Sequence, residues 1–125
     1  MNEEQLLQYF YDIDFEKKLK KTASKFKNKK IIIYGCGLMF DLIHKYFDLS
    51  ELDIIGVYDG KFKDLEQKEY KSFSIIKPEN FNKADIILIS TWNTIDIAES
   101  LKPHKVKTYP LVQKKFKDIM KEIWG

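Results

Sequence analysis

The stretch KIIIYGCGLMFDLIHKYF, residues 30–47, constrains the fold more than any other part of the chain. A continuous run of isoleucines is typical of a buried central strand in a parallel sheet. Two glycines one residue apart, Gly35 and Gly37, end that run, and an apolar helical pattern begins at Leu38. A strand, a glycine turn and a helix in direct succession form the first unit of an open sheet, which predicts an α/β fold.

Further strand patterns alternate with helical or polar stretches along the rest of the chain. The expected strands lie in DIIGVYDG, SFSII, ADIILIS and VKTYPL, and the expected helices over 78–82, 94–101 and 112–123. Residues 61–72 are charged and weakly periodic, which indicates a loop. Right-handed crossovers then predict a Rossmann-like three-layer sandwich, with a five-stranded parallel sheet in the order 3-2-1-4-5.

The length of 125 residues fits one domain. Within it, residues 1–28 form an N-terminal helical segment, interrupted at YDID, and residues 29–125 form the Rossmann-like domain with its C-terminal helix. The lysine-rich helical segment can lie on a membrane or bind a partner. The few apolar residues of its stripe favour the alternative that it packs on the core of the domain.

All 22 basic residues are lysine, and the net charge is +3. Arginine supplies the planar fork that reads bases and clamps a 2′-phosphate, so its absence argues against sequence-specific nucleic-acid binding and against NADP. A single cysteine fits a reducing compartment. The acidic start of the chain does not resemble a signal peptide, and no apolar run approaches membrane-spanning length, so we expect a cytoplasmic protein.

The glycine turn is a candidate phosphate site, because backbone N–H groups and the positive end of a helix converge there. We expect the cradle to comprise residues of the turn and the first helical positions, namely Gly35, Cys36, Gly37, Leu38 and Met39. The third glycine of a dinucleotide-binding turn is replaced by Phe40. Its ring can either lift the helix from the strand or turn into the cleft and occupy ligand space.

Other candidate ligand contacts follow the second and fourth expected strands. Asp59, followed by Gly60, lies about 20 residues beyond Gly37, where an acid can bind ribose hydroxyls; equally, DGK can be a plain turn in which Asp59 accepts backbone hydrogen bonds. Ser90 and Thr91 can bind phosphate or ribose, and Trp92 can stack on a base. The alternative makes Thr91 a helix cap and Trp92 a packed aromatic residue.

No group of residues in the sequence matches a known catalytic constellation. Cys36 lies at a helix N-terminus, which favours a thiolate, yet no base stands beside it, so a role as a small filler is favoured. His44 and His104 have no ligand-like neighbours, which argues against a metal site. A nucleophile elbow, a Walker lysine and a Tyr–Lys acid–base pair are also absent. We therefore predict no catalytic residues and no catalysis by this chain alone.

Taken together, KIIIYGCG, IIGVYDGK and SFSIIKPENFNKADIILISTWN resemble small Rossmann-like domains of bacterial surface-polysaccharide biosynthesis. Such domains accompany nucleotide-sugar dehydratases, sugar acyltransferases and methyltransferases. The resemblance covers roughly residues 29–101. It matches Gly35 and Gly37 to the turn, Asp59 to the acid, and residues 78–79 to a Pro-Glu turn.

The resemblance implies a domain that binds a nucleotide or nucleotide-sugar, with NAD as another possible cofactor. Its expected role is that of a non-catalytic or partner-dependent component, as a homodimer or beside a glycan-biosynthesis enzyme. One alternative is a protein-interaction module with a vestigial pocket, which Phe40 and the amphipathic ends of the chain motivate. A second alternative is the NAD-binding part of an oxidoreductase.

Overall fold

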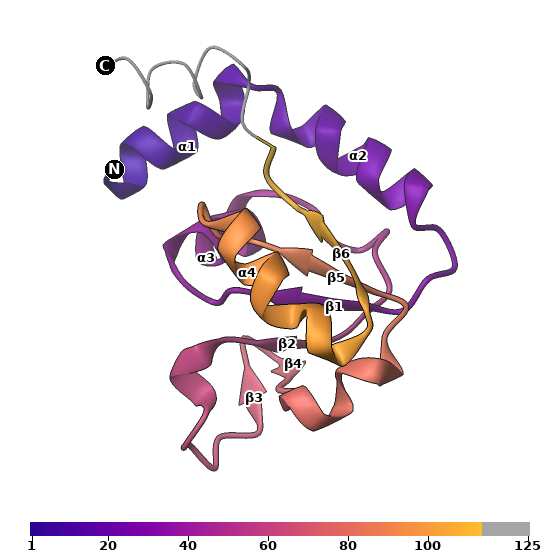
Figure 1. Cartoon of the computed structure of the whole chain (residues 1–125). Coiled ribbons are helices and arrows are strands. Elements are labelled where there is room, and N and C mark those ends of the chain that lie inside the picture. The colour runs from indigo at the N-terminus through magenta and orange to yellow at the C-terminus, as the bar shows by residue number, and fades with distance from the viewer. Residues whose placement is uncertain (114–125) are drawn as a thin grey trace.

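The computed structural model describes residues 1–113, and its centre is a four-stranded parallel sheet (Figure 1). The strands, in the order β2-β1-β5-β6, are β1 (Ile31–Tyr34), β2 (Ile54–Tyr58), β5 (Ile86–Ile89) and β6 (Lys107–Pro110). The α/β class is confirmed, whereas the predicted five strands and their order 3-2-1-4-5 are not. The expected helix over 112–123 falls almost entirely outside the described residues.

The segment predicted as a third strand forms a hairpin instead. β3 (Glu69–Tyr70) and β4 (Phe73–Ser74) pair antiparallel, and Ile75 makes a single parallel bridge to Val57 of β2. Pairing with residues only a few positions away closes a short loop and occupies backbone groups that a sheet strand would need. The stretch predicted as a loop over 61–72 therefore contains β3 and most of the 3-10 helix η1 (Gly60–Phe62).

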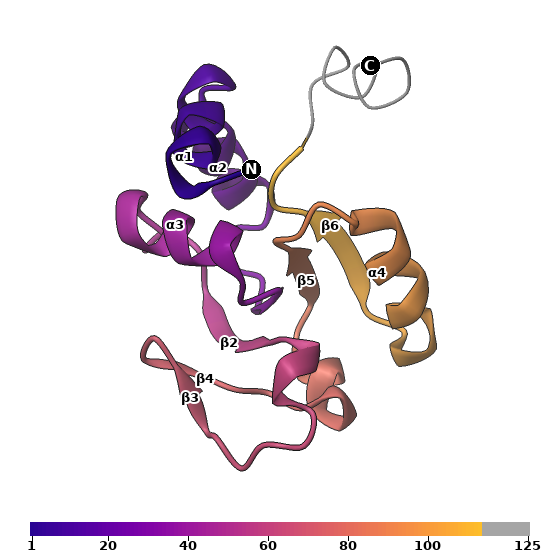
Figure 2. The same cartoon turned by 90° about the vertical axis from the view of Figure 1, so that its left-hand side faces the viewer.

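Helices cover both faces of the sheet. Figure 2 shows α3 (Leu38–Tyr46) on one side, together with α1 (Glu3–Asp12) and α2 (Phe15–Lys25), and α4 (Thr94–Leu101) on the other. There are two further 3-10 segments. The first, η2 (Pro78–Lys83), precedes β5, and the second, η3 (Lys102–His104), directly follows α4. The layers are those of an α/β sandwich with a parallel sheet in the middle.

The two N-terminal helices pack on the same core as the sheet. Their buried apolar side chains are Leu6, Phe10, Ile13, Phe15, Leu19 and Ala23. Asp14, between the helices, has a left-handed φ of 53°, which accounts for the break that YDID predicts. Phe26, just beyond α2, meets the Tyr109 ring of β6 at 5.1 Å between centroids. Within residues 1–113, no helix has the length and apolar character needed to cross a membrane.

The register of the parallel strands brings three chain segments to one edge of the sheet. Tyr34, the last residue of β1, is paired with Tyr58 of β2 and with Ile89 of β5. The residues that follow each strand must therefore meet at the carboxyl end, where open α/β sheets bind their ligands. These residues are the glycine turn, Asp59 and Ser90 with Thr91.

Candidate functional site

Gly35 is the residue that lets the turn after β1 approach the end of β5. Its φ is +114°, a region that side-chain-bearing residues rarely adopt, and its N–H donates to the Tyr58 carbonyl oxygen at 2.8 Å. A Cβ at this position would lie 2.7 Å from Thr91 Cγ2 and 3.0 Å from the Ser90 carbonyl oxygen. The turn therefore requires glycine at position 35.

Ser90 and Thr91 lie against this turn. Ser90 is only 2% exposed, and its hydroxyl donates to the Gly35 carbonyl oxygen at 2.6 Å. That bond ties the end of β5 to the turn, so the Ser90 side chain is engaged within the protein. The Thr91 Oγ1 atom is buried and has no hydrogen-bond partner among the described residues. A buried hydroxyl without a partner is energetically unfavourable, so Thr91 carries an unsatisfied polar group beside the turn, at an atom that has essentially no exposed surface.

Asp59 connects the end of β2 to the same turn. One carboxylate oxygen accepts the Cys36 N–H at 2.8 Å, and the other accepts the Lys61 N–H at 3.0 Å. The acid therefore accepts backbone hydrogen bonds, as the alternative interpretation of DGK expected. Each carboxylate oxygen has a second lone pair, so these bonds leave acceptor capacity for a ribose hydroxyl.

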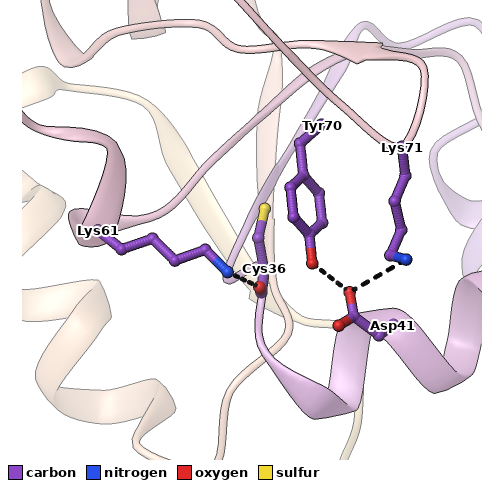
Figure 3. A network of polar contacts seen from close by, with 5 residues as sticks. All are labelled: Cys36, Asp41, Lys61, Tyr70 and Lys71. Atoms are coloured by element: carbon purple, nitrogen blue, oxygen red, sulfur yellow. Dashed lines mark hydrogen bonds and ion pairs between the residues drawn. The ribbon is translucent and has the colours of Figure 1, made fainter. Parts of the chain in front are cut away.

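Lys61 is a site residue that the sequence analysis did not single out. Its ammonium group donates to the Cys36 carbonyl oxygen at 2.5 Å and lies 4.8 Å from the centre of the Tyr70 ring (Figure 3). The carbonyl bond, together with Asp59 on the Cys36 N–H, engages both backbone polar groups of Cys36, which belong to the two successive peptide units of the turn. The only sequence signal was the position of this lysine two residues after Asp59.

The first residues of α3 present an open backbone surface. Gly37 is the N-cap, is exposed, and has nothing within 4 Å of the place where a Cβ would stand. The first intrahelical bond runs from Asp41 N–H to Gly37 O, so the amides before Asp41 have no helix carbonyl to bond. Leu38 is 43% exposed beside them, whereas Met39 is 5% exposed and points into the core. Only the backbone of Met39 can therefore contribute to the site.

Phe40 does not project into the space beside Gly37. Its ring is fully buried and lies about 6 Å, centroid to centroid, from His44, Tyr70 and Phe73. The side chain thus fills the core between α3 and the β3–β4 hairpin. The ring therefore does not turn into the cleft to occupy ligand space, which was one of the two alternatives for the missing third glycine.

Cys36 is buried and protonated. Its side chain is 0% exposed, and Sγ lies 3.8 Å from the Tyr58 carbonyl oxygen. Burial, reinforced by the nearby Asp59 carboxylate, raises the pKa of the thiol from 9.0 to about 12. The helix N-terminus therefore does not create a reactive thiolate here.

Alkylation of Cys36 by iodoacetamide at about pH 8 is expected to be roughly a thousandfold slower in the native protein than in the urea-unfolded chain, because the pKa near 12 depletes the thiolate. The reaction is followed by mass spectrometry, and the unfolded chain serves as its own control because it has the same single cysteine. Equal rates in the two states would contradict the buried placement.

A second polar cluster lies at the first turn of α3, opposite Lys61. The Tyr70 hydroxyl donates to Asp41 Oδ1 at 2.5 Å, and the Lys71 ammonium group lies 4.0 Å from the same oxygen (Figure 3). Burial and then the bond to Asp41 raise the pKa of the Tyr70 hydroxyl, so it remains a donor at neutral pH. The hairpin is thereby fastened to the helix that carries the turn.

Two other predicted residues lie at the edge of the site. Gly60 is exposed in η1, with no neighbour within 4 Å of a Cβ position. Trp92 is 37% exposed and packs edge-to-face on Tyr9 of α1, with ring centroids 5.3 Å apart. Trp92 is therefore partly a packed aromatic residue.

In the described part of the chain, no group of three or more His, Cys, Asp or Glu residues is arranged to hold a metal ion.

The structure thus brings the turn, Asp59, Ser90 and Thr91 together, with Lys61 joining them from η1. Comparison of the chain with protein-family models, with curated proteins and with solved structures finds no match.

Proposed function

We propose that this domain binds a nucleotide or nucleotide-sugar at the turn between β1 and α3. In this proposal it serves surface-polysaccharide biosynthesis as a non-catalytic or partner-dependent component, as the sequence resemblance implies. The observation that carries the proposal is the open surface at Gly37, where no atom lies within 4 Å of a Cβ position. A phosphate can approach the unbonded amides of the first turn of α3 from that side.

The neighbouring residues suit the parts of a nucleotide next to the phosphate. Asp59 stands at the end of β2 with spare acceptor capacity for a ribose hydroxyl. An acid at position 59 also repels a 2′-phosphate, which argues for ligands with a free 2′-hydroxyl.

A binding role fits the side chains of the site better than catalysis by this chain alone. The Ser90 hydroxyl is bonded to a backbone carbonyl, and Cys36 is buried and protonated. Neither is available as a nucleophile, because each would need an adjacent base and access to substrate. Asp59 and Lys61 bind the backbone N–H and the carbonyl oxygen of Cys36, respectively, so both side chains hold the turn.

Isothermal titration against NAD, UDP-glucose, dTDP-glucose and CDP-glucose tests this proposal. Binding of at least one ligand is expected, and Gly37→Leu is expected to weaken it about tenfold or more by filling the phosphate side of the turn. Gly37→Ser is the matched control, because serine is a favourable N-cap and leaves most of the space open. Silence across the panel, or equal affinities in both variants, would overturn the proposal.

A protein-interaction role is the second candidate, and exposed apolar residues at the start of α4 favour it. Ile95 is 79% exposed, and Trp92 nearby is 37% exposed. If this face binds a second copy of the chain, light scattering should report a dimer that Ile95→Lys dissociates. A monomer that is unaffected by the substitution would dismiss this candidate.

A further inference from the structure

A hollow of about 490 Å³ runs along α3 from the candidate site. Three elements line it: α3, the start of α1, and the tip of the β3–β4 hairpin. The lining residues that matter here are Glu3, Leu38, Asp41, His44, Lys45 and Lys71. Of these residues, the sequence analysis named only Leu38 as a ligand contact. The others were missed because the elements that meet here are far apart in the chain.

One end of the hollow reaches the first turn of α3, which the proposed phosphate site also uses. Leu38 and Asp41 belong to the first turn of α3, and Leu38 directly follows the open N-cap Gly37. A phosphate held by the amides of that turn would therefore direct its next substituent toward the hollow. The volume is ample for one six-membered sugar ring and falls in the range of small-molecule sites.

The charges around the hollow select a chemical class. Carboxylates of Glu3 and Asp41 accept hydrogen bonds, and the ammonium groups of Lys45 and Lys71 donate them. A sugar carries hydroxyl groups that donate and accept at adjacent carbons, so it can satisfy both kinds of partner. Asp41 and Lys71 already interact with each other, and Asp41 also accepts the Tyr70 hydroxyl, so Glu3 and Lys45 are the charged groups that sugar hydroxyls would engage.

The turn of the β3–β4 hairpin, which contributes Lys71 to the hollow, has an unfavourable backbone conformation. Lys71 and Ser72, the two residues of the turn, both have left-handed φ values, 49° and 70°. Neither is glycine, which such two-residue turns prefer, and strain of this kind concentrates at functional positions. The Tyr70–Asp41 bond fixes the tip, and the Lys71 ammonium group lies near the same Asp41 oxygen (Figure 3). Lys71 is also one of the residues that line the hollow.

We infer that the hollow binds the sugar of a nucleoside diphosphate sugar whose phosphates occupy the turn at Gly37. This inference rests on the proposed nucleotide binding and adds the position and class of the second half of the ligand. Glu3 of α1 and Lys45 of α3 contact sugar hydroxyls, and exposed Leu38 contacts the C–H face of the ring.

Titration of matched ligand pairs tests the inference: UDP against UDP-glucose, dTDP against dTDP-glucose, and GDP against GDP-mannose. For at least one pair, the sugar nucleotide is expected to bind about tenfold tighter than the bare diphosphate. Glu3→Ala is expected to abolish this margin while leaving the affinity for the bare diphosphate unchanged. Lys45→Ala, on α3, is expected to do the same.

Glu4→Ala is the matched control, because Glu4 stands beside Glu3 in the first turn of α1 but does not line the hollow. It is expected to retain the full margin. Diphosphates that bind as tightly as their sugar nucleotides would overturn the sugar site and leave nucleotide binding standing. A margin that survives in Glu3→Ala and Lys45→Ala would also overturn it. If no ligand in any pair binds, the sugar site is overturned, and the proposed function falls with it when NAD and CDP-glucose also fail to bind.

Discussion

Replacing Phe40 by glycine is expected to lower the free energy of unfolding by about 5 kcal/mol and to leave nucleotide affinity no higher. The sequence alone permits the opposite expectation, because glycine is the usual third residue of a dinucleotide-binding turn. The structure decides between them, since the Phe40 ring is fully buried between α3 and the β3–β4 hairpin.

The size of this effect follows from two additive terms. Loss of a buried phenylalanine ring destabilises a core by about 3–5 kcal/mol, and glycine inside a helix adds about 1 kcal/mol. Part of the loss arises in the hairpin, whose Tyr70 and Phe73 rings pack on Phe40. Urea denaturation followed by circular dichroism measures the change.

Leu38→Gly is the control for glycine in the same helix turn, because Leu38 is 43% exposed. It is expected to destabilise by no more than about 1 kcal/mol. Phe40→Leu keeps an apolar side chain and covers the case in which the glycine variant fails to fold; about 1.5 kcal/mol is expected for it. A Phe40→Gly protein of nearly normal stability, or one that binds nucleotide more tightly, would contradict the buried placement.

The central strands were predictable because their sequence and their burial agree. Ile31–Ile33 and Ile86–Ile89 are continuous apolar runs, and every one of these residues is at most 4% exposed. Runs of that kind, rich in β-branched residues and followed by turn residues, are typical of a strand covered on both faces. The glycine turn and the helix after β1 were predictable for the same reason, since their order fixes where the chain must reverse.

The hairpin that replaces the predicted third strand was not predictable, because the turn that closes it has no recognisable sequence signature. SFSII has the composition of a strand, and the residues before it read as a charged loop. Lys71 and Ser72 nevertheless adopt left-handed conformations and close a hairpin, where Asn-Gly would be the recognisable signal. The observed pairing is stabilised by Phe40 and Asp41, which lie about 30 residues earlier in the chain.

The candidate site was predictable in its backbone and less so in its side chains. Parallel register brings the glycine turn, Asp59 and Thr91 together, as the strand pattern indicated. The contact of Lys61 with the Cys36 carbonyl depends on the local path of η1. The approach of Lys71 to Asp41 depends on the hairpin, and no periodic pattern reports either geometry.

The two glycines of the turn are expected to respond very differently to the same substitution. Gly35→Ser should lower the free energy of unfolding by about 3 kcal/mol, because a side chain is strained at a φ of +114° and collides with its surroundings. The Ser90 carbonyl oxygen, 3.0 Å from the added Cβ, belongs to the backbone and cannot swing aside. Thr91 Cγ2, at 2.7 Å, can yield only by rotating a packed side chain.

Gly37→Ser is the matched comparison, since it adds the same atoms two residues away. Gly37 has an extended backbone with a φ of −101°, and nothing lies within 4 Å of its Cβ position. Serine is also a preferred N-cap, so its effect on stability should stay within about 0.5 kcal/mol. Paired urea denaturation curves give both values. Equal losses of stability in the two variants would contradict the close approach of Gly35 to the residues after β5. They would also contradict the open space at Gly37 on which the phosphate site depends.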